Sequence, residues 1–317
     1  MNGENFDMKK RVLILFALFF IQFNLFAINA DKGIQFKLNN DLWVTFNHFF
    51  LKAMPGEKVI VELRAGSGEF ISGTADFGTP ARLENGKWQI TAPLKSGTYF
   101  INFEEKNTGK TLTLVLFVLV PISEMDGEYL NRYRIGKYPE NEYNNDPSYN
   151  KPAGFIEVTA KNKDLYISPH FQLKQFLCKQ KSEWPKYLIV DPKLLAKLEF
   201  LLAELNKSGR NIKTLFIMSG FRTPYYNKKI GNVKYSRHVY GNAADVYVDT
   251  NGDGVIDDLN RDGKNNMDDE LVLYKIVNSF DTDPNLSKLM GGIGKYKKNS
   301  RHTFFIHIDT RGYRARW

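Results

Sequence analysis

Short hydrophobic runs separated by glycine-rich turns mark residues 31–120. Turn signals such as PGE, ENGK and NTGK separate the runs, and no segment of any length has helical periodicity. The runs are rich in β-branched and aromatic residues: VIVELRA (59–65), WQITAP (88–93), TYFINFEE (98–105) and LTLVLFVLV (112–120). This spacing predicts an all-β, immunoglobulin-like sandwich. We see no metal-ligand cluster in it, so a spacer or binding module is expected.

Residues 121–152 change to a polar pattern, with three prolines and several tyrosines within 136–154, which predicts a linker or an extended segment lying on the surface. From residue 153 helical and strand patterns mix, which predicts an α+β domain over 153–317. Leucines at 3- and 4-residue spacing make 191–209 the best helix. The other expected elements are helices at 169–178 and 268–280 and strands at 213–219, 243–249 and 303–309.

The N-terminus has the pattern of a secretory signal. A basic stretch (Lys9, Lys10, Arg11) follows Met8, an apolar run extends to about Phe26, and small residues end at Ala30. We therefore expect a signal peptide over 1–30 and export to the periplasm, cell envelope or extracellular space. An uncleaved membrane anchor is the alternative, and membrane contact is expected only in that case.

The formal net charge is +9, which suits an anionic envelope polymer. Nucleic-acid binding fits poorly, because the basic residues are scattered and the protein is expected to be exported. Cys178 is the single cysteine, so no internal disulfide forms. Its place on what looks like the apolar face of a helix favours a buried, inert thiol.

His238, Asp245 and His307 form a candidate zinc site. Imidazole and carboxylate are zinc ligands, and catalytic zinc keeps three protein ligands plus water. Two ligands close together and a third far along the chain is a common arrangement, although this spacing alone is weak support.

The neighbouring residues strengthen this assignment. SRHVYGNAAD (236–245) fits S-x-H-x-x-G-x-A-x-D, HID (307–309) fits H-x-D, and SGFRT (219–223) fits a third motif. Together they resemble the zinc D-Ala-D-Ala carboxypeptidases and murein endopeptidases, with the hedgehog fold as a relative. SPHFQLKQF (168–176) and HIDTRGYRARW (307–317) look most like the YcbK-like branch. The resemblance covers 153–317.

The resemblance implies roles for particular residues. His238, Asp245 and His307 would hold zinc, Ser236 and Gly241 would shape the ligand loop, and Arg222 would bind a substrate oxygen or the developing oxyanion. Many relatives carry a glutamate base three residues before the last histidine, where this chain has Phe304. Asp309, at i+2 from His307, is then either the general base or a partner that orients His307.

An acidic stretch at 249–270 predicts a second metal. It contains eight acidic and two basic side chains, and D-x-N-x-D-G occurs twice. This resembles the start of a calcium loop, although the first loop lacks the twelfth-place glutamate of an EF-hand. A solvated acidic loop is the alternative. The candidate calcium ligands are Asp249, Asn251, Asp253, Asp257, Asp258, Asn260 and Asp262.

These features favour an exported zinc metallopeptidase acting on peptidoglycan stem peptides or cross-links, with the β module positioning it at the wall. Two other functions stay open: a non-catalytic, zinc-containing wall-binding protein and a calcium-dependent adhesion or matrix protein. The motifs do not separate carboxypeptidase from endopeptidase, or D,D from L,D bonds.

Overall fold

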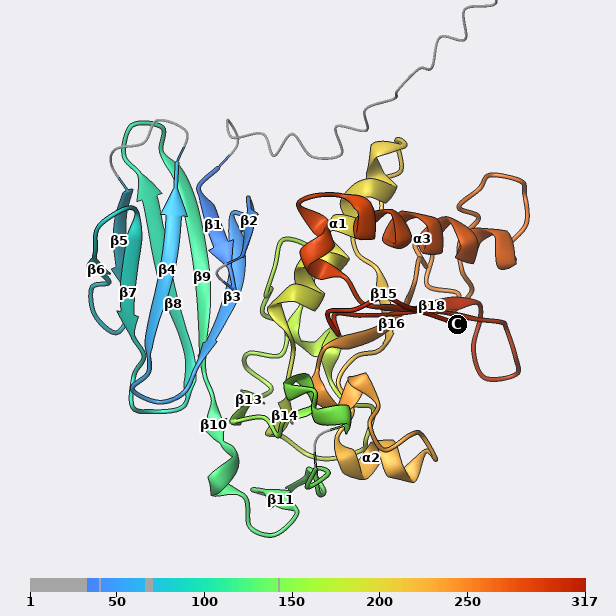
Figure 1. Cartoon of the computed structure of the whole chain (residues 1–317), viewed down its shortest axis with the longest axis horizontal. Coiled ribbons are helices and arrows are strands. Elements are labelled where there is room, and N and C mark those ends of the chain that lie inside the picture. The colour runs from blue at the N-terminus through green and yellow to red at the C-terminus, as the bar shows by residue number, and fades with distance from the viewer. Residues whose placement is uncertain (1–32, 40, 66–70, 142) are drawn as a thin grey trace, which may run out of the picture.

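The computed structural model describes residues 33–39, 41–65, 71–141 and 143–317, so the predicted signal peptide at 1–30 lies outside the described residues. Two regions lie side by side (Figure 1). The N-terminal region consists of strands, and the C-terminal region combines strands with helices. Within the described residues, no helix is both long and apolar enough to span a bilayer.

The N-terminal region contains two sheets that pack face to face. Rings from one sheet contact rings from the other: Trp88 lies 5.3 Å from Phe103, and Phe36 lies 5.5 Å from Phe49 between ring centroids. In spatial order, the first sheet contains β2 (Leu42–Val44), β1 (Gln35–Leu38), β4 (Lys58–Arg64), β7 (Lys87–Thr91) and β6 (Ala81–Arg82). The second contains β3 (His48–Ala53), β9 (Lys110–Val118), β8 (Gly97–Glu105) and β5 (Ile71–Ala75).

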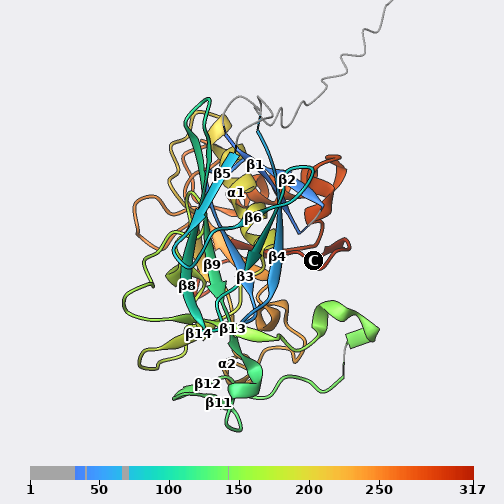
Figure 2. The same cartoon turned by 90° about the vertical axis from the view of Figure 1, so that its left-hand side faces the viewer.

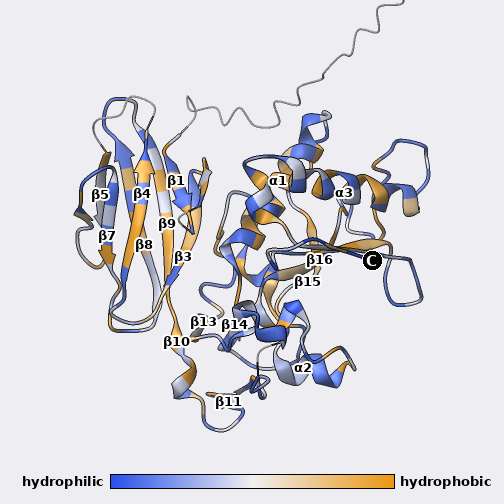
Figure 3. Ribbon diagram, viewed as in Figure 1, coloured by the Kyte–Doolittle hydropathy of each residue, from blue (hydrophilic) through white to orange (hydrophobic). Residues whose placement is uncertain are grey.

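Hydrophobic residues run along the strands of this region, as Figure 3 shows. Nearly all its pairs are antiparallel, but β3 lies parallel to β9. The immunoglobulin type of the sandwich stays a prediction.

The C-terminal region is built on a five-stranded sheet. In spatial order its strands are β15 (Phe216–Ser219), β16 (Ala243–Tyr247), β18 (Phe305–Asp309), β17 (Gly292–Tyr296) and β19 (Ala315–Arg316). Its α-helices are α1 (Pro192–Lys207), α2 (Pro224–Lys229) and α3 (Met267–Ser279). Figure 1 shows α1 and α3 on one side of this sheet and α2 on the other. The candidate metal ligands described below come from two of the three inner strands, β16 and β18, and from the turn before β16.

Helix α1 follows its leucine pattern. Asp191 caps it by accepting a hydrogen bond from the Lys193 amide at 2.8 Å, and Pro192 occupies the first turn, where no amide donor is needed. The predicted leucine stripe is buried at every position: Leu194, Leu195, Leu198, Leu201, Leu202 and Leu205.

The segment at 121–152, predicted as a linker or surface segment, is anchored on the C-terminal region. Ile135 O accepts a hydrogen bond from the Tyr225 amide at 3.0 Å, and Tyr138 Oη donates to Val239 O at 3.1 Å. Figure 2 shows this segment below the sandwich. It contains the hairpin β11 (Tyr129–Leu130) and β12 (Tyr133–Arg134), and β10 (Val120–Pro121) joins β13 (Gly154–Val158) and β14 (Lys186–Leu188) in a small sheet.

Short 3-10 helices also occur in the described part of the chain. They are η2 (Ile122–Glu124), η3 (Tyr143–Asn145), η4 (Pro147–Tyr149), η5 (Leu173–Phe176), η6 (Arg237–Tyr240), η7 (Phe280–Thr282) and η8 (Leu286–Leu289).

The two regions meet at α1. Lys193 Nζ lies 2.8 Å from Asp41 Oδ2, and the ring of Phe46 lies 5.7 Å from that of Phe200. The β module therefore covers one side of the helix that supports the C-terminal sheet.

The prediction of a helix at 169–178 is wrong, because only the 3-10 helix η5 forms there. The buried residues Phe171, Leu173, Phe176 and Cys178 are spaced by two or three, which gives no continuous helical stripe. Instead, the Leu173 amide bonds to Leu165 O at 2.9 Å, so the segment lies against an extended neighbour. Cys178 is buried, as predicted, and burial raises the pKa of its thiol.

Candidate metal centre

Three predicted ligands meet on adjacent elements. Asp245 on β16 lies directly opposite His307 on β18 in the antiparallel register, so both side chains project to the same face. His238 is on η6, and Gly241 then turns the chain into β16 with φ of 72°. A Cβ at Gly241 would lie 2.5 Å from Ile189 O, so a side chain there would displace the loop.

The three ligand atoms converge on one point. His238 Nε2 lies 3.2 Å from both Asp245 Oδ1 and His307 Nδ1, and the last two atoms are 2.9 Å apart. Ligands of a tetrahedral zinc at its usual bond lengths lie about 3.3 Å from one another. The donor set and its spacing therefore fit zinc.

Neighbouring acceptors orient both imidazoles. His238 Nδ1 lies 2.7 Å from Gly220 O, and because a carbonyl only accepts, Nδ1 carries the proton. His307 Nε2 lies 3.2 Å from Asp309 Oδ2, so it donates to that carboxylate. Each ring thus directs its unprotonated nitrogen to the shared point, as a metal ligand requires.

The electrostatics also favour a cation. Burial lowers the pKa of His238, which keeps this imidazole neutral. Burial would raise the pKa of Asp245, but the two histidines outweigh it and hold that pKa well below its usual range. His238 is thus a neutral imidazole beside an ionised carboxylate, the protonation state that binds metal. Burial would lower the pKa of His307, but Asp245 and Asp309 outweigh it and raise that pKa.

Arg222 lies behind the Asp245 carboxylate. Its Nη2 donates to Asp245 Oδ2 at 2.6 Å, and its Nε donates to Ser219 Oγ at 2.8 Å. One carboxylate oxygen is thus held by the guanidinium, while Oδ1 faces the two histidines. Arg222 was predicted to bind a substrate oxygen or the developing oxyanion. In the structure its guanidinium bonds to the candidate ligand Asp245, and the residue also lines the cleft.

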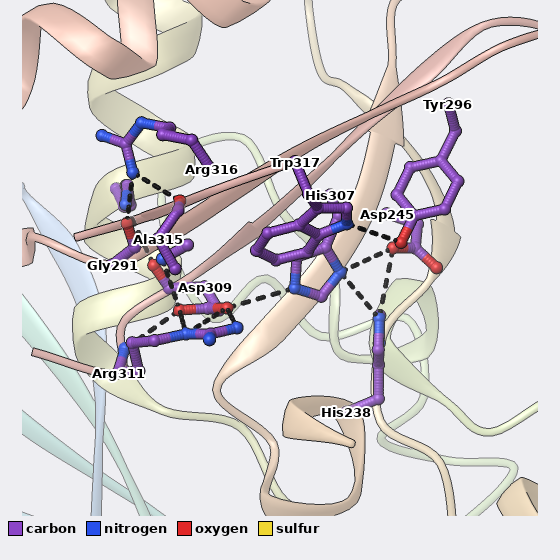
Figure 4. Close-up of polar contacts among 12 residues, drawn as sticks. His238, Asp245, Gly291, Tyr296, His307, Asp309, Arg311, Ala315, Arg316 and Trp317 are labelled. Carbon is purple, nitrogen blue, oxygen red and sulfur yellow. Dashed lines mark hydrogen bonds and ion pairs between the residues drawn. The ribbon is translucent and has the colours of Figure 1, made fainter. Parts of the chain in front are cut away.

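Asp309 lies on the far side of His307 from the shared point (Figure 4). It is fully buried, and its carboxylate accepts hydrogen bonds from Arg311 Nε at 2.9 Å and the Gly292 amide at 2.7 Å. Lys197 Nζ, also buried, donates to Asp309 O at 3.0 Å. These contacts fit the orienting partner rather than the general base, the two roles that the sequence left open for Asp309.

Residues 169–273 match the family model of Peptidase M15. The match contains Arg222, His238 and Asp245 but ends before His307. A search of curated proteins found no match.

The match supports the predicted relationship to the M15 zinc peptidases and a metallopeptidase function for this chain. M15 peptidases depend on zinc, and the His-Asp-His cluster is a group that could hold this metal. The YcbK-like branch and the carboxypeptidase or endopeptidase type stay predictions.

A cleft of about 950 Å³ opens over His238, Asp245 and His307. Among the described residues that line it, Asp245 has the only acidic side chain. Its cations are Arg222, Lys234, Arg237, Arg301 and Arg311, and its aromatic residues are Tyr143, Tyr149, Tyr235, Tyr296, Phe305, Tyr313 and Trp317. The cleft is therefore basic and aromatic.

The 121–152 segment forms part of this cleft, which sequence reasoning missed. Asp146 Oδ2 lies 3.2 Å from Arg237 Nη2, and the Arg237 guanidinium lies 3.8 Å from the Tyr149 ring centroid. Tyr143 and Tyr149 line the cleft beside Tyr235. The alternation of tyrosines with prolines in 136–154 is the signal that could have indicated more than a linker.

The predicted calcium residues form two similar turns. Asp249 Oδ2 accepts from the Gly254 amide at 3.0 Å, and Asp258 Oδ2 accepts from the Gly263 amide at 2.8 Å. Asn251 and Asn260 each reach the aspartate two residues on, and Asp257 instead binds Thr250. Across the described ranges, His238, Asp245 and His307 are the only group of three or more His, Cys, Asp or Glu gathered closely enough for one ion.

Proposed function

We propose that the protein is an exported zinc metallopeptidase that hydrolyses peptide bonds in peptidoglycan stem peptides or cross-links. One observation carries the proposal: His238 Nε2, Asp245 Oδ1 and His307 Nδ1 lie 2.9–3.2 Å apart, with both rings held in the metal-binding tautomer. The M15 match over 169–273, which contains His238 and Asp245, supports a peptidase function for this cluster.

The chain's own residues prepare the site. When bound, zinc acts as a Lewis acid that polarises the scissile carbonyl and activates water. Asp309 keeps the Nε2 proton of His307 in place, and Gly220 O does the same for Nδ1 of His238. Arg222 fixes Asp245 and contributes positive charge at the cleft wall.

His302 is the candidate proton acceptor. It lines the cleft and is its only imidazole outside the ligand cluster, among the residues that the structure describes. Its Nδ1 donates to Thr303 O at 2.8 Å, and its Nε2 accepts from Asn299 Nδ2 at 2.6 Å. The lone pair of Nε2 is thus occupied by the Asn299 amide, and His302 can take a proton from water only where water displaces that amide.

The charge of the cleft supports an acidic peptide substrate. Five cationic side chains line the cleft. Arg222, Arg237 and Arg311 are paired with carboxylates, which leaves Lys234 and Arg301 without an ion pair among the described residues. Peptidoglycan stem peptides carry free carboxylates, and a positive cleft attracts them. The formal charge of +9 is consistent with work at an anionic envelope.

Mass spectrometry of defined muropeptides tests this function. The protein lacking residues 1–30 should release a peptide or amino acid from them, a chelator should stop the release, and added zinc should restore it. The masses of the products identify the bond cut. His238→Ala should lose both zinc and hydrolysis, whereas His170→Ala, which removes a partner of Glu199 outside the cleft, should lose neither.

A second candidate is a non-catalytic, zinc-containing protein that binds the cell wall. Phe304 stands where many relatives have a glutamate, and the buried Asp309 contacts Arg311 and the far side of His307. Pull-down with purified peptidoglycan, without any change in muropeptide masses, would favour this function over hydrolysis.

We also propose that the 249–263 turns bind calcium. The support is the repeated pattern of aspartates, asparagines and glycines, in which two turns nine positions apart make the same amide contacts. Loops of flexible oxygen ligands suit calcium better than magnesium.

A further inference from the structure

Tyr296 faces the cleft beside the metal ligands. Strands β17 and β18 pair Gly294 with His307 and Tyr296 with Phe305. Directly paired residues share a sheet face, and so do residues at i and i+2. Tyr296 therefore projects to the same side as His307, one pair further along, and its side chain is 37% exposed in the cleft.

Trp317 holds the Tyr296 hydroxyl in place. Its indole Nε1 donates to Tyr296 Oη at 2.9 Å, and its ring centroid lies 5.2 Å from that of His307 (Figure 4). An indole N–H can only donate, so the phenol oxygen is the acceptor in this bond. The hydroxyl makes no other hydrogen bond with the described residues, and its own proton is available to a ligand in the cleft.

Strand β17 is shaped to receive this indole. A Cβ at Gly294 would lie 2.3 Å from Trp317 Nε1, and one at Gly292 would lie 3.0 Å from the far end of the same ring. The Tyr296 ring also stacks on the Phe305 ring, with centroids 4.7 Å apart and an interplanar angle of 4°. The phenol is thus fixed from two directions.

Two other donors close to the cluster already use some of their N–H groups within the protein. Arg222 bonds to Asp245 and Ser219, and Arg311 bonds to Asp309. Hydrolysis of a peptide bond develops negative charge on the carbonyl oxygen, and an aligned donor stabilises this charge. Tyr296 supplies such a donor on the sheet face that carries the ligands.

We infer that Tyr296 is a catalytic residue whose hydroxyl donates a hydrogen bond to the carbonyl oxygen of the scissile bond, and that Trp317 positions it. This inference rests on the proposed peptidase function. Water supplies both the oxygen of the new carboxylate and the proton that the leaving amine receives, and Tyr296 keeps its own proton throughout.

Tyr296→Phe is the direct test, with the muropeptide that the wild-type protein hydrolyses fastest. The ring and its stacking stay, and only the donor is lost. We expect kcat to fall about 100-fold, as for removal of one oxyanion donor, with KM and zinc content unchanged. Tyr166→Phe, at an exposed tyrosine outside the cleft, is the matched control and should retain full activity.

Trp317→Phe tests the positioning role. It keeps an aromatic ring but removes the Nε1 donor, and kcat should fall about tenfold, the equivalent of one neutral hydrogen bond. In the Tyr296→Phe variant, Trp317→Phe should not lower kcat any further, because both substitutions act through the Tyr296 hydroxyl.

Additive losses in the double variant would overturn the role of Trp317, and an unchanged kcat for Tyr296→Phe would overturn the whole inference. A wild-type protein that cleaves no muropeptide would overturn the proposed function itself, and the catalytic role of Tyr296 with it. Melting temperature and zinc content, measured for every variant, separate these outcomes from misfolding.

Discussion

Asp309 and Asp245 bind opposite edges of the His307 ring. Asp309 Oδ2 accepts from Nε2 at 3.2 Å, while Asp245 Oδ1 lies 2.9 Å from Nδ1. A carboxylate on the protonated edge makes the other nitrogen a stronger ligand. Asp309 therefore acts on a candidate metal ligand, and the proton acceptor that we propose, His302, is a separate residue.

Asp309→Asn should weaken zinc binding. The amide still accepts a hydrogen bond but loses the charge that orients His307 and neutralises Arg311, so zinc affinity should fall about 10- to 100-fold. Competition with a chromogenic chelator measures this change. Asp164→Asn, at an exposed ion pair, is the control. Unchanged affinity combined with a large loss of turnover would instead make Asp309 the general base.

His302→Ala should remove the proton acceptor while leaving the ligand cluster intact. We expect kcat to fall at least about 100-fold, as loss of a general base usually costs, with normal zinc content. Partial recovery of hydrolysis on adding imidazole to this variant would support proton transfer by the missing ring. Normal turnover would exclude His302 from the mechanism.

Glu270 should make stability depend on pH. Burial raises its pKa to about 6, against the opposing effects of the Tyr296 amide and Lys295. The folded state then holds this proton more tightly than the unfolded state. The protonated Glu270 therefore makes its full contribution to the free energy of unfolding below the unfolded pKa, and this contribution is lost as pH rises through about 6.

Glu270→Gln keeps an acceptor for the Tyr296 amide without the charge. Relative to wild type, the free energy of unfolding of this variant should rise by at most roughly 2 kcal/mol between pH 4 and pH 8. Melting curves of both proteins at these two pH values measure the difference. A constant difference in melting temperature would show that Glu270 does not titrate in this range.

Calcium should raise the melting temperature of the protein if the 249–263 turns bind it, because a ligand of the native state alone stabilises that state. Magnesium should do less. Asp253→Ala combined with Asp262→Ala should abolish the shift and leave zinc content normal. The same melting curve with and without millimolar calcium would identify a solvated acidic loop.

The elements that sequence predicted well are those whose signal is local. The leucine stripe of α1 and its Asp191–Pro192 start lie within one continuous segment, and the structure has the helix there. The strand expected at 213–219 shortens to β15, and Phe216 is 43% exposed because β15 lies at the sheet edge. Edge position depends on pairing with distant strands, which periodicity does not report.

The residues that sequence reasoning missed depend on such pairing. Tyr296 and Trp317 come together only because β19 lies parallel to β17, which brings Trp317 beside Gly294. The run Gly291, Gly292 and Gly294 was the available signal, since glycine inside a strand often marks a close approach. No motif connected it to the metal ligands.

The pairing of β16 with β18 also sets an order of events during synthesis. His307 follows Asp245 by 62 residues, so a ribosome must add the acidic turns, α3 and β17 before the third ligand exists. Until then the chain offers one imidazole and one carboxylate, too few to retain zinc tightly. Tight zinc binding by this cluster is therefore expected only after most of the C-terminal sheet has been made.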